Sequence, residues 1–247
     1  MPLRSIDLGK KYPAFRISDV RDFVTFIDRH VDDNFTLFRG QRRDLPMLPS
    51  IARKTNDETI LEIEQQLLAE FRRQSAPLLP SQPEHELDWL AIAQHHGMPT
   101  RLLDWTSNPM AALWFATRKD PHAKKSFGVV WCFTPKLSDV ISHSDSERDS
   151  PFSGNRTQIY QPAHIAPRIA AQDGYFTVHK YAKKSERFIA LQSNTVYEKN
   201  LKKIEIPASA FNGIRRELNR WGIHALSMFP GIDGLAARVS SLHGFHF

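Results

Sequence analysis

The sequence predicts an α+β fold, a single domain in which N-terminal helices pack on a mixed or antiparallel sheet. Helical spacing of apolar residues dominates the first part of the chain, and short strand-like apolar runs become more frequent later. The sequence contains no internal repeat, low-complexity tract or evident linker. Its 247 residues are enough to bury a sizeable core, so we expect one domain over 1–247.

The expected helices follow from apolar spacing and from their terminal residues. Apolar side chains recur at the i, i+3, i+4, i+7 spacing over 18–32, where Ser18 is the expected N-cap. Asn108 is a good N-cap and Pro109 a good first helical residue, so a helix is expected to begin there. Similar signals predict helices over 57–74, 86–96 and 208–221.

Short apolar runs predict the strands. The clearest is 127–133, which carries the single cysteine, Cys132, as a core thiol. Further strands are expected over 35–41, 100–106, 168–179, 187–192 and 203–206. The polar stretch 136–155 is expected to be a loop, and 231–234 a turn.

Composition favours a cytoplasmic globular protein outside the membrane. The chain is 41% hydrophobic and 24% charged, which is ordinary for such proteins. No apolar stretch approaches the roughly 18–20 residues that span a bilayer, and the N-terminus lacks the apolar core of a signal peptide. One cysteine excludes an internal disulfide and a cysteine-based zinc ribbon.

The positive charge is concentrated late in the chain. Residues 179–220 hold ten Lys or Arg against four Glu, a net charge of +6 that equals the excess of the whole chain. A single pair such as Lys183 and Lys184 is usually a solvated face, but the stretch as a whole favours a phosphate-rich partner. The expected nucleic-acid-binding residues are Lys180, Lys183, Lys184 and Arg187.

The run LFRGQ at 37–41 places Arg39 among apolar residues and follows it with Gly40. A buried guanidinium without an anion is very costly, so Arg39 needs a negative partner. Arg101 and Asp104 lie three residues apart in an extended run and therefore point to opposite faces. Asp104 is thus free to pair with Arg39 from another strand, and a ligand anion is the other possible partner.

The stretch AQHHGMPTRLLDWTSNP gathers polar residues beside a helix N-terminus, where anions bind favourably. Thr106 and Ser107 either contact a ligand phosphate or ribose there or help to cap the helix. His95 and His96 are poor metal ligands, because adjacent helical residues project about 100° apart and no third ligand is suitably spaced. We expect no metal site and a ligand-orienting or structural role for His95. A nucleophile elbow, an NTPase phosphate loop and a dinucleotide fingerprint are absent from the sequence.

Three motifs resemble those of the FRG domain family: FRGQ, then QHHGMPTRLLDWTSNPMAALWFAT, then RIAAQDGYFTVH. The resemblance implies one FRG-type domain with core motifs over 35–179 and a basic part over 179–247. The order of elements also resembles that of ADP-ribosyltransferases. In those enzymes one strand carries Arg or His and a small residue, a second carries Ser or Thr before a helix, and a late strand carries Glu. Arg39-Gly40, Thr106-Ser107 and Gln172 fall at these places, although Gln172 is neutral.

This second resemblance implies an ADP-ribosyltransferase-like fold that uses NAD as a substrate. Arg39 would then grip the pyrophosphate through two charge-assisted hydrogen bonds, each contributing about 1.5–3 kcal/mol. Gly40 would let the backbone approach the nicotinamide amide. Gln41 lies on the same strand face as Arg39 and would contact a ribose, unless it is an ordinary surface glutamine.

The resemblance also implies that a carboxylate assists the transfer. Gln172 can hold a ribose hydroxyl but cannot supply charge. Asp104 is the nearest carboxylate in the motifs and the expected substitute, and Asp173 is the second candidate. If neither reaches the site, the domain binds a nucleotide without transferring it.

The leading hypothesis is therefore an NAD-dependent mono-ADP-ribosyltransferase, a toxin or phage-defence effector whose acceptor is RNA or DNA. An antitoxin protein is expected as a partner of that class. The alternative is a non-catalytic nucleic-acid- or nucleotide-binding module of a bacterial defence system. A purely protein-binding domain is a third hypothesis.

Overall fold

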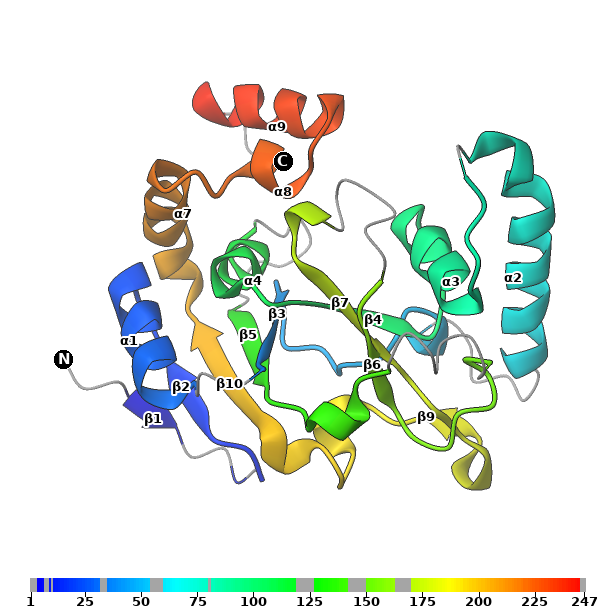
Figure 1. The fold of residues 1–247 in the computed structure, drawn as a ribbon. Coiled ribbons are helices and arrows are strands. Elements are labelled where there is room, and N and C mark those ends of the chain that lie inside the picture. Colours follow the sequence, from blue (N-terminus) through cyan, green and yellow to red (C-terminus); the bar gives the residue numbers. More distant parts are fainter. Residues whose placement is uncertain are drawn as a thin grey trace.

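The computed structural model describes residues 4–6, 9, 11–31, 35–53, 60–79, 81–118, 127–141, 150–162 and 170–244. Over these residues the fold is α+β, as predicted, with helices packed against a mixed sheet (Figure 1). The described helices are α1 (Val20–His30), α2 (Ile60–Ser75), α3 (Glu86–His95), α4 (Pro109–Ala116), α7 (Phe211–Arg220), α8 (Ala225–Met228) and α9 (Ile232–Leu242).

The main sheet has eight strands in the order β1-β2-β10-β5-β3-β4-β7-β6. Only β2 and β10 run parallel; the other neighbours are antiparallel. The strands are β1 (Arg4–Ile6), β2 (Ala14–Arg16), β3 (Leu37–Gln41), β4 (Leu102–Thr106), β5 (Gly128–Phe133), β6 (Gln158–Tyr160), β7 (Gly174–Val178) and β10 (Leu201–Ile206). A separate hairpin joins β8 (Tyr181–Ala182) to β9 (Arg187–Phe188).

The sheet consists of two parts that meet at one point. β3 pairs with β5 from Leu37 to Gln41, and β4 pairs with β7 along its whole length. Between β3 and β4, in contrast, the only register pair is Phe38 with Thr106. The two strands separate beyond that pair, which leaves a seam between the halves of the sheet.

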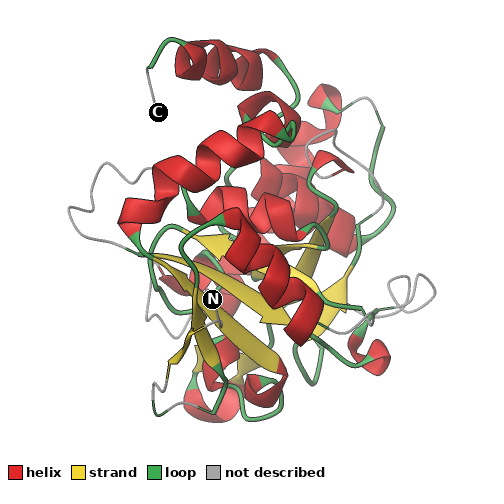
Figure 2. Cartoon of the chain, turned by 90° about the vertical axis from the view of Figure 1, so that its left-hand side faces the viewer, coloured by secondary structure: helices red, strands yellow, loops and turns green. Residues whose placement is uncertain are grey.

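Helices cover one face of the sheet, and loops with short helical turns cover the other. Phe38 and its neighbours on that face pack with α1, α4 and α7, while Leu102 and Phe176 pack with α2 and α3. Leu37 and Leu103, which point the other way, pack with Trp131 and with loop residues such as Met47, Leu191 and Tyr197. Figure 2 shows most of the helical ribbon on one side of the strands.

The helix predicted to begin at Asn108 is confirmed, and its capping is explicit. Asn108 Oδ1 accepts hydrogen bonds from the backbone N–H groups of Met110 at 2.9 Å and Ala111 at 3.2 Å. The predicted cap of α1 is wrong by one residue. Asp19 caps the helix by accepting from the backbone N–H of Asp22 at 2.8 Å, and Ser18 donates to the Asp22 carboxylate instead.

The C-terminal part differs most from the expectation. Residues 231–234 do not form an isolated turn but start α9, and α8 precedes them. Helices therefore lie at both ends of the chain rather than mainly at its beginning. The strand expected over 168–179 begins only at Gly174, and residues 163–169 lie outside the described part. The short strands β1, β2 and β6 were not expected from sequence.

Gly40 is the point where α4 approaches β3 most closely. A Cβ at this position would lie 1.9 Å from the carbonyl oxygen of Ala112 and 2.8 Å from the backbone nitrogen of Ala116. Both are backbone atoms of α4, so no rotation of a side chain can make room. The absent side chain of Gly40 thus fixes the distance between helix and sheet.

The buried ion pair of Glu64 and Arg101 ties α2 to the start of β4. Arg101 Nη2 lies 2.6 Å from Glu64 Oε2, and its Nε lies 3.0 Å from both carboxylate oxygens. Nη1 donates to the carbonyl oxygen of Pro151 at 2.8 Å. Both side chains are almost completely buried, so each charge depends on the other.

We expect Glu64→Ala to lower the free energy of unfolding by about 3–5 kcal/mol, because it leaves the Arg101 charge buried without its partner. Chemical denaturation followed by circular dichroism measures the change. The matched control is Glu70→Ala on the same helix, which removes an exposed carboxylate and should leave stability nearly unchanged. An equally small effect of both substitutions would contradict this role of the pair.

Substitution of Gly40 by Ala should destabilise the protein by about 1–3 kcal/mol or more, since α4 must move away from β3. Thermal unfolding of Gly40→Ala and of Gly213→Ala provides the comparison. Gly213 lies within α7, and a Cβ there meets no atom within 4 Å. Gly213→Ala should therefore stabilise by about 0.5–1 kcal/mol, the helical preference of Ala over Gly. If Gly40→Ala unfolds at the same temperature as the parent, the close approach does not constrain the fold.

Candidate functional site

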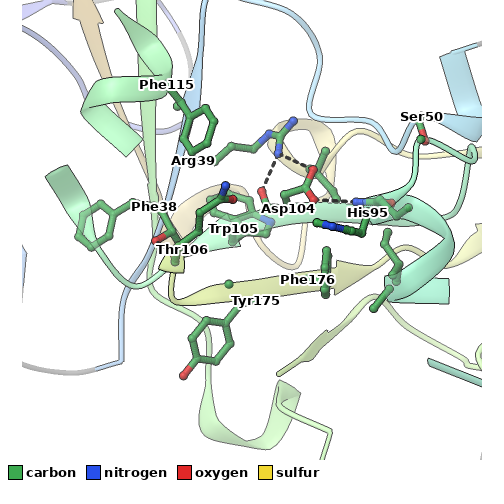
Figure 3. A pocket seen from close by; sticks show the side chains of 18 of the residues that line it. Phe38, Arg39, Ser50, His95, Asp104, Trp105, Thr106, Phe115, Tyr175 and Phe176 are labelled. Atoms are coloured by element: carbon green, nitrogen blue, oxygen red, sulfur yellow. Dashed lines mark hydrogen bonds and ion pairs between the residues drawn. The ribbon is translucent and has the colours of Figure 1, made fainter. Parts of the chain in front are cut away.

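A pocket of about 380 Å³ opens at the seam between β3 and β4 (Figure 3). Residues of β3, β4, β7 and α3 line it, together with Arg53 and Phe115. Its volume is in the range of small-molecule sites, and its wall combines aromatic side chains with a few polar groups. Six residues proposed from sequence line it: Arg39, Gly40, His95, Asp104, Thr106 and Gln172.

Arg39 has an internal partner, but the pairing is incomplete. Its Nη1 donates to the backbone carbonyl of Asp104 at 2.6 Å and lies 3.6 Å from the carboxylate oxygen Oδ2. The Arg39 side chain is 15% exposed, whereas that of Asp104 is 64% exposed. Nε is buried without a hydrogen-bond partner in the described part of the chain. The pocket beside the guanidinium leaves space for a second anion.

Burial lowers the pKa of Arg39, and the attraction of Asp104 opposes that shift. Arg53 on the same pocket lowers the pKa of Arg39 further. An arginine nevertheless keeps its proton, so the consequence is a cation with a high affinity for negative charge.

Asp104 is held on the rim of the pocket by a chain of hydrogen bonds. Gln94 on α3 donates from Nε2 to Asp104 Oδ1 at 2.8 Å. The Thr100 hydroxyl donates to Gln94 Oε1, which fixes the orientation of the amide. The carboxylate is thus positioned between α3 and Arg39 while most of its surface stays accessible.

Thr106 links β4 to β7 at the inner end of the pocket. Its hydroxyl donates to the carbonyl oxygen of Gln172 and accepts from the backbone N–H of Asn108 at 3.0 Å. The sequence left two roles open for Thr106, contact with a ligand or capping of the helix. The structure shows the second, because the Thr106 hydroxyl supports the start of α4. Ser107 is exposed, donates its backbone N–H to Asp173 at 3.1 Å and does not line this pocket.

Gln172 lies beside Thr106, just before β7, and lines the pocket. Its side-chain Nε2 donates to the carbonyl oxygen of Met228 at 2.8 Å. The amide therefore fastens the end of α8 to the pocket wall, and its Oε1 remains available as an acceptor. Asp173, next in the chain, has a left-handed backbone (φ 44°) and is exposed outside the pocket lining.

The expectations for Gln41 and Gly40 need correction. Gln41 does share the face of Arg39, but its Oε1 accepts from the indole Nε1 of Trp131 at 3.0 Å and the residue is buried outside the pocket lining. It is therefore neither a ribose contact nor a surface residue. Gly40 lines the pocket, but the close packing of α4 by itself requires a glycine there.

The basic segment does not form one surface. Lys180, Lys183, Lys184 and Arg187 are exposed at the β8–β9 hairpin, in the lower right of Figure 1, whereas α7 with its arginines lies at the upper left. Lys203, counted in the same segment, is buried and lies 2.7 Å from Asp44 and 3.2 Å from Glu205. The local excess of charge in the sequence is thus distributed over separate places.

Several pocket residues were not proposed from sequence. Gln94, Tyr175 and Phe176 belong to the quoted motifs, but nothing in the motifs distinguishes them as site residues. Arg53 stands outside the motifs, and only the fold of the loop before α2 brings it to the pocket. Within the described residues, no group of three or more His, Cys, Asp or Glu is arranged to hold a metal ion.

Comparison with known proteins gives one match. Residues 34–125 match the family model of the FRG domain, and no curated protein or solved structure matches the chain. The match contains Arg39, Asp104 and Thr106, while the third motif with Gln172 lies beyond it. A search of the described helices finds none with the length and apolar character needed to cross a membrane. The chain therefore carries an FRG domain over residues 34–125.

Proposed function

We propose that the pocket at the seam binds NAD and that the protein is an NAD-dependent mono-ADP-ribosyltransferase. One observation carries the proposal. Arg39, Thr106 and Gln172, the three positions that correspond to those enzymes, come from the neighbouring strands β3 and β4 and the entry to β7 and line one pocket. The same arrangement supports an ADP-ribosyltransferase-like fold.

Arg39 is the proposed anchor for the pyrophosphate. Its guanidinium keeps donors that Asp104 does not use, and its burial strengthens a charge-assisted hydrogen bond. Arg53 adds a second positive charge to the pocket, although it also donates to the carbonyl oxygen of Leu48. Two cations suit a ligand with two phosphate groups.

The reaction would break the bond between nicotinamide and ribose in NAD. Nicotinamide leaves with the bonding electrons, and the acceptor attaches to the same ribose carbon and gives up a proton. A carboxylate favours this step by stabilising positive charge on the ribose and by accepting the proton. Asp104 is the carboxylate that lines the pocket, and Oε1 of Gln172 can accept from a ribose hydroxyl.

The proposed acceptor is nucleic acid, RNA or DNA, because the chain carries an excess of positive charge on exposed elements. A toxin or phage-defence role, with an antitoxin as partner, is the biological setting in which such a modification would act.

A specific feature favours the alternative of a non-catalytic nucleotide- or nucleic-acid-binding module. Gln172 is neutral, and its amide nitrogen already serves a structural purpose at Met228. Under this alternative the pocket binds NAD or a related nucleotide without releasing nicotinamide. Calorimetry with NAD and a chromatographic assay of nicotinamide release together separate the two functions.

Removal of the Arg39 guanidinium should abolish the labelling of nucleic acid by NAD that carries a radioactive adenylate. We expect Arg39→Ala to reduce the rate about a hundredfold or more, and Arg39→Lys to restore little of it, because a lysine cannot bind in the bidentate manner. Arg21→Ala, an exposed change on α1, is the control. Mass spectrometry of RNA, DNA and protein after incubation identifies the acceptor. Undiminished labelling by Arg39→Ala would remove Arg39 from the mechanism.

The Asp104→Asn substitution tests the proposed carboxylate separately from binding. The amide can still contact Gln94 but carries no charge, so the labelling rate should fall about a hundredfold while the affinity for NAD changes little. Parallel measurements on Asp173→Asn decide between the two acids. Loss of activity in Asp173→Asn with full activity in Asp104→Asn would assign the role to Asp173.

A further inference from the structure

Helix α9 exposes the kind of side chain that a surface helix normally buries. Its large aliphatic residues are all exposed: Ile232 by 76%, Leu235 by 42%, Val239 by 47% and Leu242 by 61%. The side of the helix that is turned toward the rest of the protein carries the buried Gly234 and the half-buried Ala237 and Ser241. The helix is therefore amphipathic in the opposite sense to a helix that packs its apolar face on its own core.

Gly234 fixes which side of α9 faces inward. A Cβ at this position would lie 1.8 Å from the carbonyl oxygen of Phe229 and 3.1 Å from that of Ala225, the residues that end and begin α8. Only glycine allows this approach, so α9 rests on α8 with its small residues inward. In Figure 1 α9 lies at the outer end of the molecule, and no described helix or strand lies beyond it. The apolar face of α9 therefore points into the solvent.

The exposed aliphatic residues form a continuous line, which we call the aliphatic stripe: Ile232, Leu235, Val239 and Leu242. At 100° per helical residue they fall within an arc of about 80°. Their separations of three, four and three residues are those of alternating a and d positions, through which two helices interlock. Asp233 and Arg238 lie outside the arc, on opposite sides of it. The stripe thus suits another apolar helix face rather than a charged ligand.

Among the described residues, no other helix or strand offers a similar stripe. The remaining exposed large apolar residues are Val24, Leu45, Leu78, Phe127, Leu137, Val196 and Trp221, and no two of them share a helix or strand. A second copy of the chain can therefore cover the aliphatic stripe only with its own α9. An interface in which both copies use the same surface has twofold symmetry and closes as a dimer.

The area of the aliphatic stripe is sufficient for such a dimer. Its exposed fractions correspond to roughly 400 Å² of aliphatic surface per copy, which is in the range of functional apolar patches. Apolar atoms make up about 65% of a homodimer interface, so two stripes imply a total buried area of about 1,200 Å². Specific and stable interfaces begin at about this size. Because α9 is already folded against α8, pairing costs little conformational entropy.

We propose that two copies of this chain form a dimer by packing their aliphatic stripes against each other. The spacing of the stripe fits helix pairing, its arc holds no charge that would oppose its own copy, and its area matches what a dimer needs. Because α9 lies at the outer end of each molecule, the two bodies lie on opposite sides of the helix pair (Figure 1). The dimer does not depend on the proposed function.

The test is size-exclusion chromatography with light scattering of the full chain at about 1–100 µM, where the mass should rise from one chain toward two. Leu235→Glu should raise the dissociation constant at least about a hundredfold, because it places an unpaired carboxylate in the apolar interface. Leu137→Glu is the matched control. It makes the same change at a leucine that is 78% exposed in the turn after β5 (Leu137–Asp139), and it should dimerise like the parent.

Val239→Lys provides a second variant with the opposite charge, and it should also remain monomeric. Both residues are exposed, so thermal unfolding of the two monomers should resemble that of the parent, and slower amide exchange in α9 at high concentration should be confined to the parent and Leu137→Glu. A parent that stays monomeric throughout, or a Leu235→Glu variant that dimerises equally well, would overturn the proposal. Binding of a monomeric parent to phosphatidylcholine vesicles would assign the stripe to a lipid surface instead. None of these measurements involves NAD, so their outcome is separate from that of the labelling assay.

Discussion

The single register pair between β3 and β4 is the constraint on which the site depends. Every other pair of neighbouring strands in the main sheet shares at least three register positions, so hydrogen bonds close the gaps between them. At Phe38 and Thr106 the two halves of the sheet touch and then diverge. Backbone polar groups at the seam must therefore find hydrogen-bond partners other than a neighbouring strand. The carbonyl oxygen of Asp104 is one such group, and it accepts a hydrogen bond from the Arg39 guanidinium across the opening.

The incomplete pairing of β3 with β4 explains why the sheet tolerates the charged side chain of Arg39. A hydrophobic residue in place of Arg39 would leave the Asp104 carbonyl without that donor and would let the seam close by apolar contact. A complete internal salt bridge, as between Glu64 and Arg101, would instead neutralise the charge and bury it. Arg39 lies between these extremes. It is held by one strong hydrogen bond, its ion pair is long, and open volume lies beside it. That combination suits a residue whose second partner is a ligand.

Much of this could be predicted from sequence, for identifiable reasons. The start of α4 is encoded locally by Asn108 and Pro109, and the apolar run of β5 by its composition, so both were predicted. Arg39 and Asp104 were proposed as site residues because charged side chains are unusual within apolar runs. The partner of Gln41 was not predictable, since Trp131 reaches it through long-range strand pairing. The requirement for glycine at position 40 was not predictable either, because it arises from the close packing of α4 against β3. Helix α8 is only four residues long, and Gly231 and Gly234 gave the start of α9 the sequence pattern of a turn.

Charge counting along the sequence gives the net charge of a segment but not where its charges lie on the folded protein. A run of basic residues in sequence becomes one surface only if the fold keeps it together, and here β10 and its flanking turns separate the hairpin from α7. Arginines on α7 are joined by Arg118 from the end of α4, which lies nearly a hundred residues earlier. Arg118 and Arg215 lie against the Trp114 ring, whereas Lys183 and Lys184 on the hairpin are exposed. The count of charges along the sequence therefore does not show which basic side chains share a surface, because the fold decides that.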